Sequence, residues 1–598
     1  MSQVKIVSAR RLLLVTGLLA LTLPVLAQDR PQPGAAAPTT PPPAETTAPP
    51  AQEPAPAQRP RPRGEEAIGE IDSVIAEVRT QAIPAPPPAV ELPEHARRDP
   101  NIVGALDPVQ LGLGDNPWGG ASGAFLSTLM RRMDTPLASR WVHIALRNAV
   151  LAETHAPRNV HPVDWVAERA WLLLRMGEAD GARLLVSGVD VDQFTPKMFQ
   201  VALQSALANA DPSGLCPLEE GLVRVERRVH PMVQAMCAAL AGEPESAAAQ
   251  IDNARRRGQV SGIDLELAQK VVGAGTNTGR AVTIEWEPVQ ELNTWRFGLA
   301  TATGMTFPDR LTNNAPPRLR AWQARAPLLS PQQRLASARI ATGLGVFSSQ
   351  ALLDLYSIIY DSTDAEELGG TDAWQLRLAF AGRTEQARLE AMRRLWAVGQ
   401  DPLEREASRA LLARAAARFT PDAELEADAG NLIASMLAAG LDREAAAWVP
   451  VVNRIDNHNG DSAWAMLALA APDTNGLDVS AGRVNAFITR DTSPGRKRSA
   501  LLVAGLAGLG RLDLDAADRL NSRHNLGLDR RSRWTGVIDS SAALGQPATV
   551  LLLTGTGFQT SLFEQLPSAH LYHSVAALRR TGQDFTARMI AAEALSRT

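Results

Sequence analysis

Most of the chain beyond about residue 121 alternates between apolar runs with helical spacing and short breaks at glycine. The clearest example spans residues 171–188, with the sequence WLLLRMGEADGARLLVSG. An apolar run ends at Gly177, a short acidic turn follows, and Ala182 lies inside the next run. Glycine adopts the left-handed conformation that commonly ends a helix, and an early alanine lets the next helix approach closely. The pattern therefore predicts two antiparallel helices joined by a tight turn.

The same glycine-to-alanine spacing returns along the chain. It occurs at Gly242 with Ala247, Gly382 with Ala387, Gly440 with Ala445 and Gly582 with Ala587, and more loosely at Gly510 with Ala516. One such hairpin cannot bury its apolar face, whereas stacked hairpins can. We therefore predict an all-α fold, an irregular α-solenoid of stacked antiparallel helical hairpins that follows a disordered N-terminal segment. The alternative is a non-repetitive helical domain in which some of these spacings are coincidences.

Proline-rich and irregular stretches indicate where the chain divides. The predicted segments are a signal peptide (1–27), a Pro/Ala-rich disordered linker (28–64), a short amphipathic helix with a Pro-rich connector (65–118), an N-terminal helical-hairpin array (119–290), an irregular connecting segment (291–329) and a C-terminal helical-hairpin array (330–598). Within the first array, Thr135 and Pro136 are expected to open a helix as N-cap and first residue. The polar end of the last hairpin, Ser596 to Thr598, is expected to cap the array.

The first residues have the pattern of an export signal. Lys5, Arg10 and Arg11 precede the apolar stretch LLLVTGLLALTL, which is short for a transmembrane helix. Small residues before position 28 predict cleavage after Ala27, which would release the protein into the periplasm. The alternative is a retained signal that anchors the protein in the inner membrane, facing the periplasm. The linker that follows has almost no large apolar residues and cannot form a core.

The chain contains two cysteines, Cys216 and Cys237. An even cysteine count in an exported protein favours a disulfide, and the segment between them can form a helix and a turn that bring the two together. Such a bridge would close a loop of about 20 residues and stabilise the fold by ~3 kcal/mol. Two buried free thiols are the alternative.

No familiar catalytic or nucleotide-binding motif is present, so we predict no catalytic, cofactor-binding or metal-binding residues. His570 and His573 are three residues apart on a predicted helix, which by default is a surface or half-buried pair rather than a metal site. Most tryptophans lie inside helical runs and are expected in the core. Trp118, Trp286 and Trp322 lie near helix breakers and are candidates to line a groove. The net charge of −4 argues against nucleic acid as a partner.

The hairpin layout resembles that of tetratricopeptide-like α-solenoids. The stretches MLAAGLDREAAAWVPVV and ALRRTGQDFTARMIAAEAL carry the resemblance best, although the regular Trp, Gly, Tyr and Pro positions of tetratricopeptide repeats are absent. The whole chain looks like exported helical proteins of alphaproteobacteria, a resemblance that implies no activity and no catalytic residues.

The export signal, the linker and the hairpins together favour a non-enzymatic scaffold of the bacterial periplasm or cell envelope. Solenoids present extended surfaces to peptide or protein partners. One alternative is a peptidoglycan-associated enzyme relative, similar to the helical superhelix of lytic transglycosylases but without a recognisable catalytic domain. Another is a tethered subunit of an envelope machine.

Overall fold

The computed structural model describes residues 93–598, apart from 259, 277–281, 400 and 456–457. The predicted signal peptide, the linker and the amphipathic helix at 65–81 lie outside the described residues. Leu92–Thr598 forms one compact unit. The divisions predicted after residues 290 and 329 therefore fall inside a single body.

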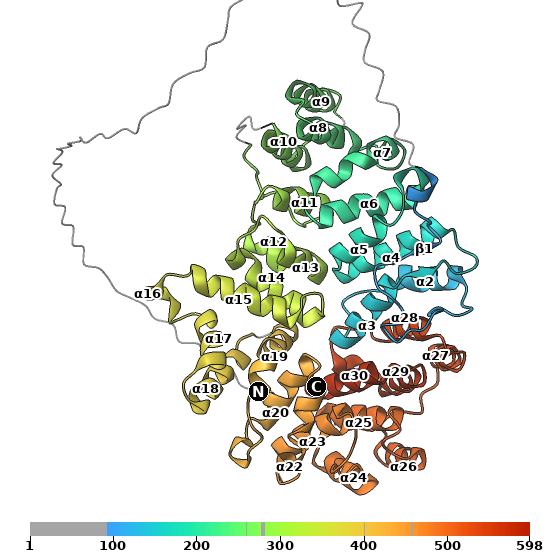
Figure 1. The fold of residues 1–598 in the computed structure, drawn as a ribbon, viewed down its shortest axis with the longest axis vertical. Coiled ribbons are helices and arrows are strands. Elements are labelled where there is room, and N and C mark those ends of the chain that lie inside the picture. The colour runs from blue at the N-terminus through green and yellow to red at the C-terminus, as the bar shows by residue number, and fades with distance from the viewer. Residues whose placement is uncertain (1–92, 259, 277–281, 400, 456–457) are drawn as a thin grey trace, which may run out of the picture. The chain divides into compact units, whose positions relative to one another are not determined.

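The described residues confirm the all-α class (Figure 1). The first elements are η1 (Glu94–Ala96), β1 (Ile102–Val103), α2 (Gly123–Arg132), α3 (Arg140–Leu151), β2 (Thr154–His155), α4 (Pro162–Met176), α5 (Ala179–Val186), η2 (Val191–Gln193), α6 (Pro196–Ala208), η3 (Pro212–Leu218), α7 (Glu219–Val225), α8 (His230–Leu240), α9 (Pro244–Arg256) and α10 (Ile263–Gly275). The strands β1 and β2 form a short antiparallel pair.

The middle of the chain is also helical, including the segment predicted to be irregular. Its elements are α11 (Thr294–Ala302), α12 (Asp309–Asn313), α13 (Pro317–Arg325), α14 (Pro331–Leu344), α15 (Ser349–Ser362), α16 (Ala365–Leu368), α17 (Asp372–Ala381), α18 (Glu385–Trp396) and α19 (Pro402–Ala416). The prolines that suggested irregularity separate three short helices, α11 to α13.

The last part of the chain continues the pattern. Its elements are η4 (Ala423–Leu425), α20 (Ala429–Ala438), α21 (Asp442–Ala446), α22 (Val449–Val452), α23 (His458–Ala470), α24 (Ala481–Arg490), η5 (Pro494–Arg496), α25 (Lys497–Gly508), α26 (Leu514–His524), α27 (Arg533–Ala543), α28 (Pro547–Gly557), η6 (Phe563–Gln565), α29 (Ser568–Arg580) and α30 (Asp584–Ser596).

Four of the predicted glycine turns share one hydrogen-bond pattern. Between α4 and α5, Gly177 has a φ of +89° and its N–H donates to the Leu174 carbonyl, 3.0 Å away. The N–H of Glu178 donates to Leu173 at 2.8 Å, and the N–H of Ala182 donates to Glu178 at 3.0 Å. This is the Schellman motif followed at once by a new helix, with Gly177 ending α4 and Glu178 capping α5.

The same bonds form at three other predicted turns, those at Gly242, Gly440 and Gly582. The alanine five residues after each of these glycines, and after Gly177, is fully buried. Alanine suits the position because it has no side-chain atoms beyond Cβ to separate the packed helices. At the looser copy, Gly510 also has a positive φ, and Ala516 is buried.

One predicted turn has a different backbone geometry, and one turn was missed. Gly382 ends α17 but has a φ of −56°. The helix α18 begins at Glu385 after the N-cap Thr384, whose hydroxyl accepts from the N–H of Ala387. Gly545, with a φ of +65°, makes the same turn between α27 and α28. The missed turn has Val550 where the others have alanine, so spacing to alanine could not find it.

The predicted start of the first long helix is also wrong. Thr135 and Pro136 are joined by a cis peptide bond and lie before the helix. The helix α3 begins at Arg140, and Ser139 caps it by accepting from the N–H of Val142. A Thr-Pro pair is therefore no helix start here, because a serine nearer to the apolar run takes the capping position.

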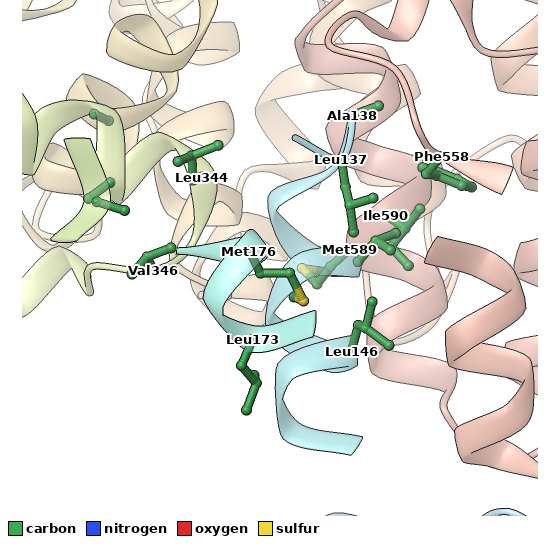
Figure 2. Close-up of a cluster of buried hydrophobic side chains, with 14 of the residues drawn as sticks. Leu137, Ala138, Leu146, Leu173, Met176, Leu344, Val346, Phe558, Met589 and Ile590 are labelled. Atoms are coloured by element: carbon green, nitrogen blue, oxygen red, sulfur yellow. The ribbon is translucent and has the colours of Figure 1, made fainter. Parts of the chain in front are cut away.

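Helices from the two ends of the described chain pack together. The helices α2 and α3 contact α28, and α3 also contacts α30 and α14. In a solenoid each repeat contacts only its neighbours in sequence, so the solenoid arrangement is not confirmed although the hairpins are. Figure 2 shows the result, one apolar cluster with Leu146 from α3, Met176 from α4, Leu344 from α14, and Met589 and Ile590 from α30.

The last helix is central and does not cap an array. Every residue of α30 from Ala587 to Leu595 is buried. It contacts α3, α20, α23, α25 and α29. The polar end that was expected to face solvent is largely enclosed, since the side chain of Arg597 is only 5% exposed. We refer to α3, α14, α19, α20 and α30 as the hub.

A buried carboxylate links the two ends of the chain inside the hub. Glu593 of α30 accepts from the Ser139 hydroxyl at 2.5 Å and from the backbone N–H of Arg140 at 2.8 Å. It also accepts from the backbone N–H of Trp141 at 3.3 Å and from the guanidinium of Arg597 at 2.7 Å. A buried charge is tolerated only when it is paired and hydrogen-bonded in this way.

The buried Arg140 side chain links α3 to helices from the middle of the chain. Arg140 donates to the carbonyl of Thr342 near the end of α14 and to that of Ala438 at the end of α20, at 3.0 and 2.6 Å. The carbonyls at a helix C-terminus carry partial negative charge, which favours a cation. Burial lowers the pKa of Arg140, and the nearby carboxylates oppose that shift.

Candidate functional site

The two cysteines are paired. Cys216 in η3 and Cys237 in α8 lie at disulfide distance, with their Cα atoms 5.5 Å apart. The short helix α7 lies between them, and α8 returns to contact η3. The disulfide is compatible with an oxidising compartment.

The tryptophans proposed as groove residues are in the core instead. Trp118, Trp286 and Trp322 are at most 8% exposed. Trp118 packs edge-on against Trp165, and Trp286 packs edge-on against Phe307. Helix breakers near a tryptophan therefore do not mark an exposed ring in this protein.

His570 and His573 each lie beside a different protein group and do not converge on a shared site. The Nδ1 atom of His573 lies 2.9 Å from an Asp539 carboxylate oxygen, and that of His570 lies 3.0 Å from the Gly557 carbonyl. His155 is in β2, and His161 is the N-cap of α4. Within the described ranges, no group of three or more His, Cys, Asp or Glu side chains is arranged to hold a metal ion.

An open groove lies between α15 and α17, which contact each other in the middle of the chain. Ser348 and Thr371 cap the two helices through their hydroxyl groups. The buried stripe of α15 follows helical spacing, at Leu352, Leu355, Tyr356 and Ile359. The groove has a volume of about 260 Å³ and is lined by Leu353, Asp354, Tyr356, Ser357, Tyr360, Asp361, Ala373, Leu376, Arg377 and Phe380. We call it the α15–α17 groove.

Three of the ten lining residues are aromatic. Two of the three tyrosines in the chain, Tyr356 and Tyr360, are here with Phe380. The ring of Tyr360 stacks on Trp374, with centroids 6.3 Å apart and planes at 6°. The Arg377 guanidinium lies over the ring of Tyr360, 5.6 Å from its centroid. These contacts hold Tyr360 in a defined position before any ligand arrives.

The side chain of Tyr356 is held by a hydrogen bond from α14. Its hydroxyl accepts from the guanidinium of Arg339 on α14, 3.0 Å away. Burial raises the pKa of this hydroxyl, more than Arg339 lowers it, so the group remains a neutral phenol. The floor of the groove is therefore apolar with one oriented hydroxyl.

The surroundings of the groove are acidic. Between residues 340 and 376 the chain has six acidic residues and neither lysine nor arginine. The acidic residues are Asp354, Asp361, Asp364, Glu366, Glu367 and Asp372. Asp372 lies 3.7 Å from Arg339, whereas Asp354 and Asp361 form no ion pair with any residue that the structure describes. This groove was not predicted, although tyrosines four residues apart beside unpaired aspartates were a visible signal.

Two other hollows are less suited to recognition. One, of about 230 Å³, is lined by Trp141 and Phe585, which pack edge-on where α3 meets α30. It lies over the hub and contains no charged side chain. The other, of about 750 Å³, opens beside Cys216 and is lined by the edge-on pair Phe194 and Phe199, by acidic residues and by Arg224.

None of the helices in the described part of the chain is both long and apolar enough to cross a membrane. The fold and the groove define an all-α protein of helical hairpins with an acidic aromatic groove. No protein-family model, curated protein or solved structure matches the chain.

Proposed function

We propose that this protein is a non-enzymatic interaction scaffold of the bacterial periplasm or cell envelope, and that it holds a segment of a partner protein in the α15–α17 groove. The observation that supports the proposal best is the pre-positioned aromatic lining of that groove. Tyrosine and tryptophan are enriched where proteins bind one another, because they bury much surface at little entropic cost. The rest of the described chain supplies a rigid frame for the groove.

The compartment is part of the same proposal. The export signal read from the sequence and the disulfide between Cys216 and Cys237 both agree with the periplasm. Cleavage after Ala27 would release the protein, and retention of the signal would tether it. Mass spectrometry of the mature N-terminus distinguishes the two.

Site-specific photo-cross-linking tests the scaffold function. A photoreactive residue replaces Ser357, which is exposed and lines the groove, and in a control it replaces the exposed Asp518 on α26. We expect position 357 to give a discrete adduct in envelope extract that position 518 does not give. The adduct should disappear when Tyr360→Ala is added. Identical adducts from both positions, or none from position 357, would contradict the proposal.

The enzyme alternative has its own test. Purified protein is incubated with isolated peptidoglycan, and soluble fragments are measured. We expect no release above that of a heat-denatured control. Release that depends on the folded protein would replace the scaffold function with a cell-wall activity.

A further inference from the structure

We infer that the segment bound in the α15–α17 groove is cationic, with lysine or arginine beside an apolar side chain. The inference rests on the proposed function and specifies the chemistry of its partner. It follows from the groove's apolar interior together with the uncompensated negative charge along one of its edges.

The apolar part of the ligand is set by the floor of the groove. Leu353, Ala373 and Leu376 line it beside the ring of Tyr356. A volume of about 260 Å³ is below the range usual for a drug-sized ligand. The space therefore suits an aliphatic or aromatic side chain of a longer peptide rather than a whole small molecule.

The charge of the ligand is set by α15. Asp354 and Asp361 are seven residues apart, two helical turns, so both carboxylates lie along the same edge of the groove. The nearest partner of Asp354 is the neutral amide of Gln350, 2.8 Å away. The short helix α16 adds exposed Glu366 and Glu367. In Figure 1, α16 is at the outer margin of the described helices, beyond the end of α15.

Arg377 is the only positive charge in the lining, and it is already engaged. Its guanidinium lies over the face of Tyr360, where a cation is attracted by the ring. Arg339 pairs with Asp372, one of the six acidic residues between 340 and 376. The single cation of the lining does not balance the other five. Complementary charge steers a partner toward such a surface and disfavours a partner of the same sign. An acidic segment would therefore be repelled.

Peptide binding to the full-length protein tests the charge. Three synthetic peptides share the same apolar positions and carry lysine, glutamate or glutamine at the remaining ones. Fluorescence anisotropy gives each Kd for the wild type, for Asp354→Asn with Asp361→Asn, and for a control with Asp515→Asn and Asp518→Asn on α26. The four aspartates are exposed, so none of these variants should lose its fold.

We expect the lysine peptide to bind most tightly and to weaken as salt is added. Two exposed ion pairs predict a loss of affinity of about two- to thirtyfold in the groove variant and no loss in the control. Equal Kd values for the lysine peptide in the wild type and the groove variant would overturn the inference. Tighter binding of the glutamate or glutamine peptide would do the same.

The outcomes also separate the inference from the scaffold function. If the charge preference fails but position 357 still cross-links to a partner, the scaffold function stands and its ligand is not cationic. If no peptide binds and position 357 gives no adduct, both fail. Sedimentation of the protein alone tests a second copy as occupant, because concentration-dependent dimers that the groove variant abolishes would replace the peptide with another molecule of this chain.

Discussion

The helices α30 and α15 have similar lengths and different burial. In α30 nine consecutive residues, Ala587 to Leu595, are buried on all sides. In α15 the buried residues are confined to one stripe, Leu352, Leu355, Tyr356 and Ile359. A helix buried all round holds other helices together, whereas a helix with one buried stripe keeps the other face for solvent or a partner. Stability should therefore depend on the hub, and recognition on the groove.

The largest expected effect comes from the buried carboxylate of the hub. Glu593→Ala should lower the free energy of unfolding by about 3–5 kcal/mol, because it leaves the buried Arg597 guanidinium without its partner. Urea unfolding followed by circular dichroism measures the loss. The control Glu366→Ala, on exposed α16, should change it by less than about 0.5 kcal/mol. Similar urea unfolding midpoints for the two variants would contradict the stabilising role given to the hub.

One isoleucine in α30 and one in α15 form a matched pair for substitution by alanine. Ile590 in α30 is fully buried, and Ile358 in α15 is 51% exposed. Ile590→Ala should cost about 2–5 kcal/mol, through lost burial and the cavity that remains. Ile358→Ala should cost under about 0.5 kcal/mol. The same denaturation curves test both, and a costly Ile358→Ala would mean that this face of α15 is packed.

The stability lost when a turn glycine is replaced by alanine should depend on the space around it. At Gly582 an added Cβ would meet nothing within 4 Å, so Gly582→Ala should cost only the left-handed backbone penalty of about 1–2 kcal/mol. At Gly177 a Cβ would lie 2.8 Å from the Cβ of Ala321 on α13. Gly177→Ala should therefore cost more than Gly582→Ala. Thermal unfolding of both variants checks the order, and the reverse order would mean that packing at Gly177 yields easily.

The smallest expected effect is a loss of folding stability at alkaline pH, caused by Tyr356 in the groove. Burial raises the pKa of Tyr356 above its usual value, so the folded state retains the phenol proton longer than the unfolded state does. The stability from this group is complete below about pH 10 and is lost as the pH rises through the raised pKa. The stability of the wild type should therefore fall more steeply above pH 10 than that of Tyr356→Phe. Parallel slopes would show that the hydroxyl is not buried.

The sequence predicted the hairpins because their chemistry is local. A glycine and an alanine five residues later are sufficient to define the turn at Gly177, whatever the rest of the chain does. Gly382 fits the same spacing and also lies between two packed helices, but its φ is negative and Thr384 caps the next helix. The local pattern thus identified these turns, although not the backbone geometry of the turn at Gly382.

The packing between distant segments could not be read in this way. Glu593 and Arg140 are 453 residues apart, and neither has a pattern that names the other. The groove was missed for the same reason, because Tyr360 and Arg377 come together only when α17 folds back along α15. Both tyrosines and the run without lysine or arginine were visible, but their neighbours were not.

Hydrogen exchange of the intact protein, read by mass spectrometry, tests most directly whether α30 holds the two ends together. The backbone amides of α30 and α3 should exchange last and together, because both open only when the hub opens. Those of α15 and α17 should exchange earlier. If α30 instead exchanges early and independently of α3, as a fraying end would, the central role given to this helix is wrong.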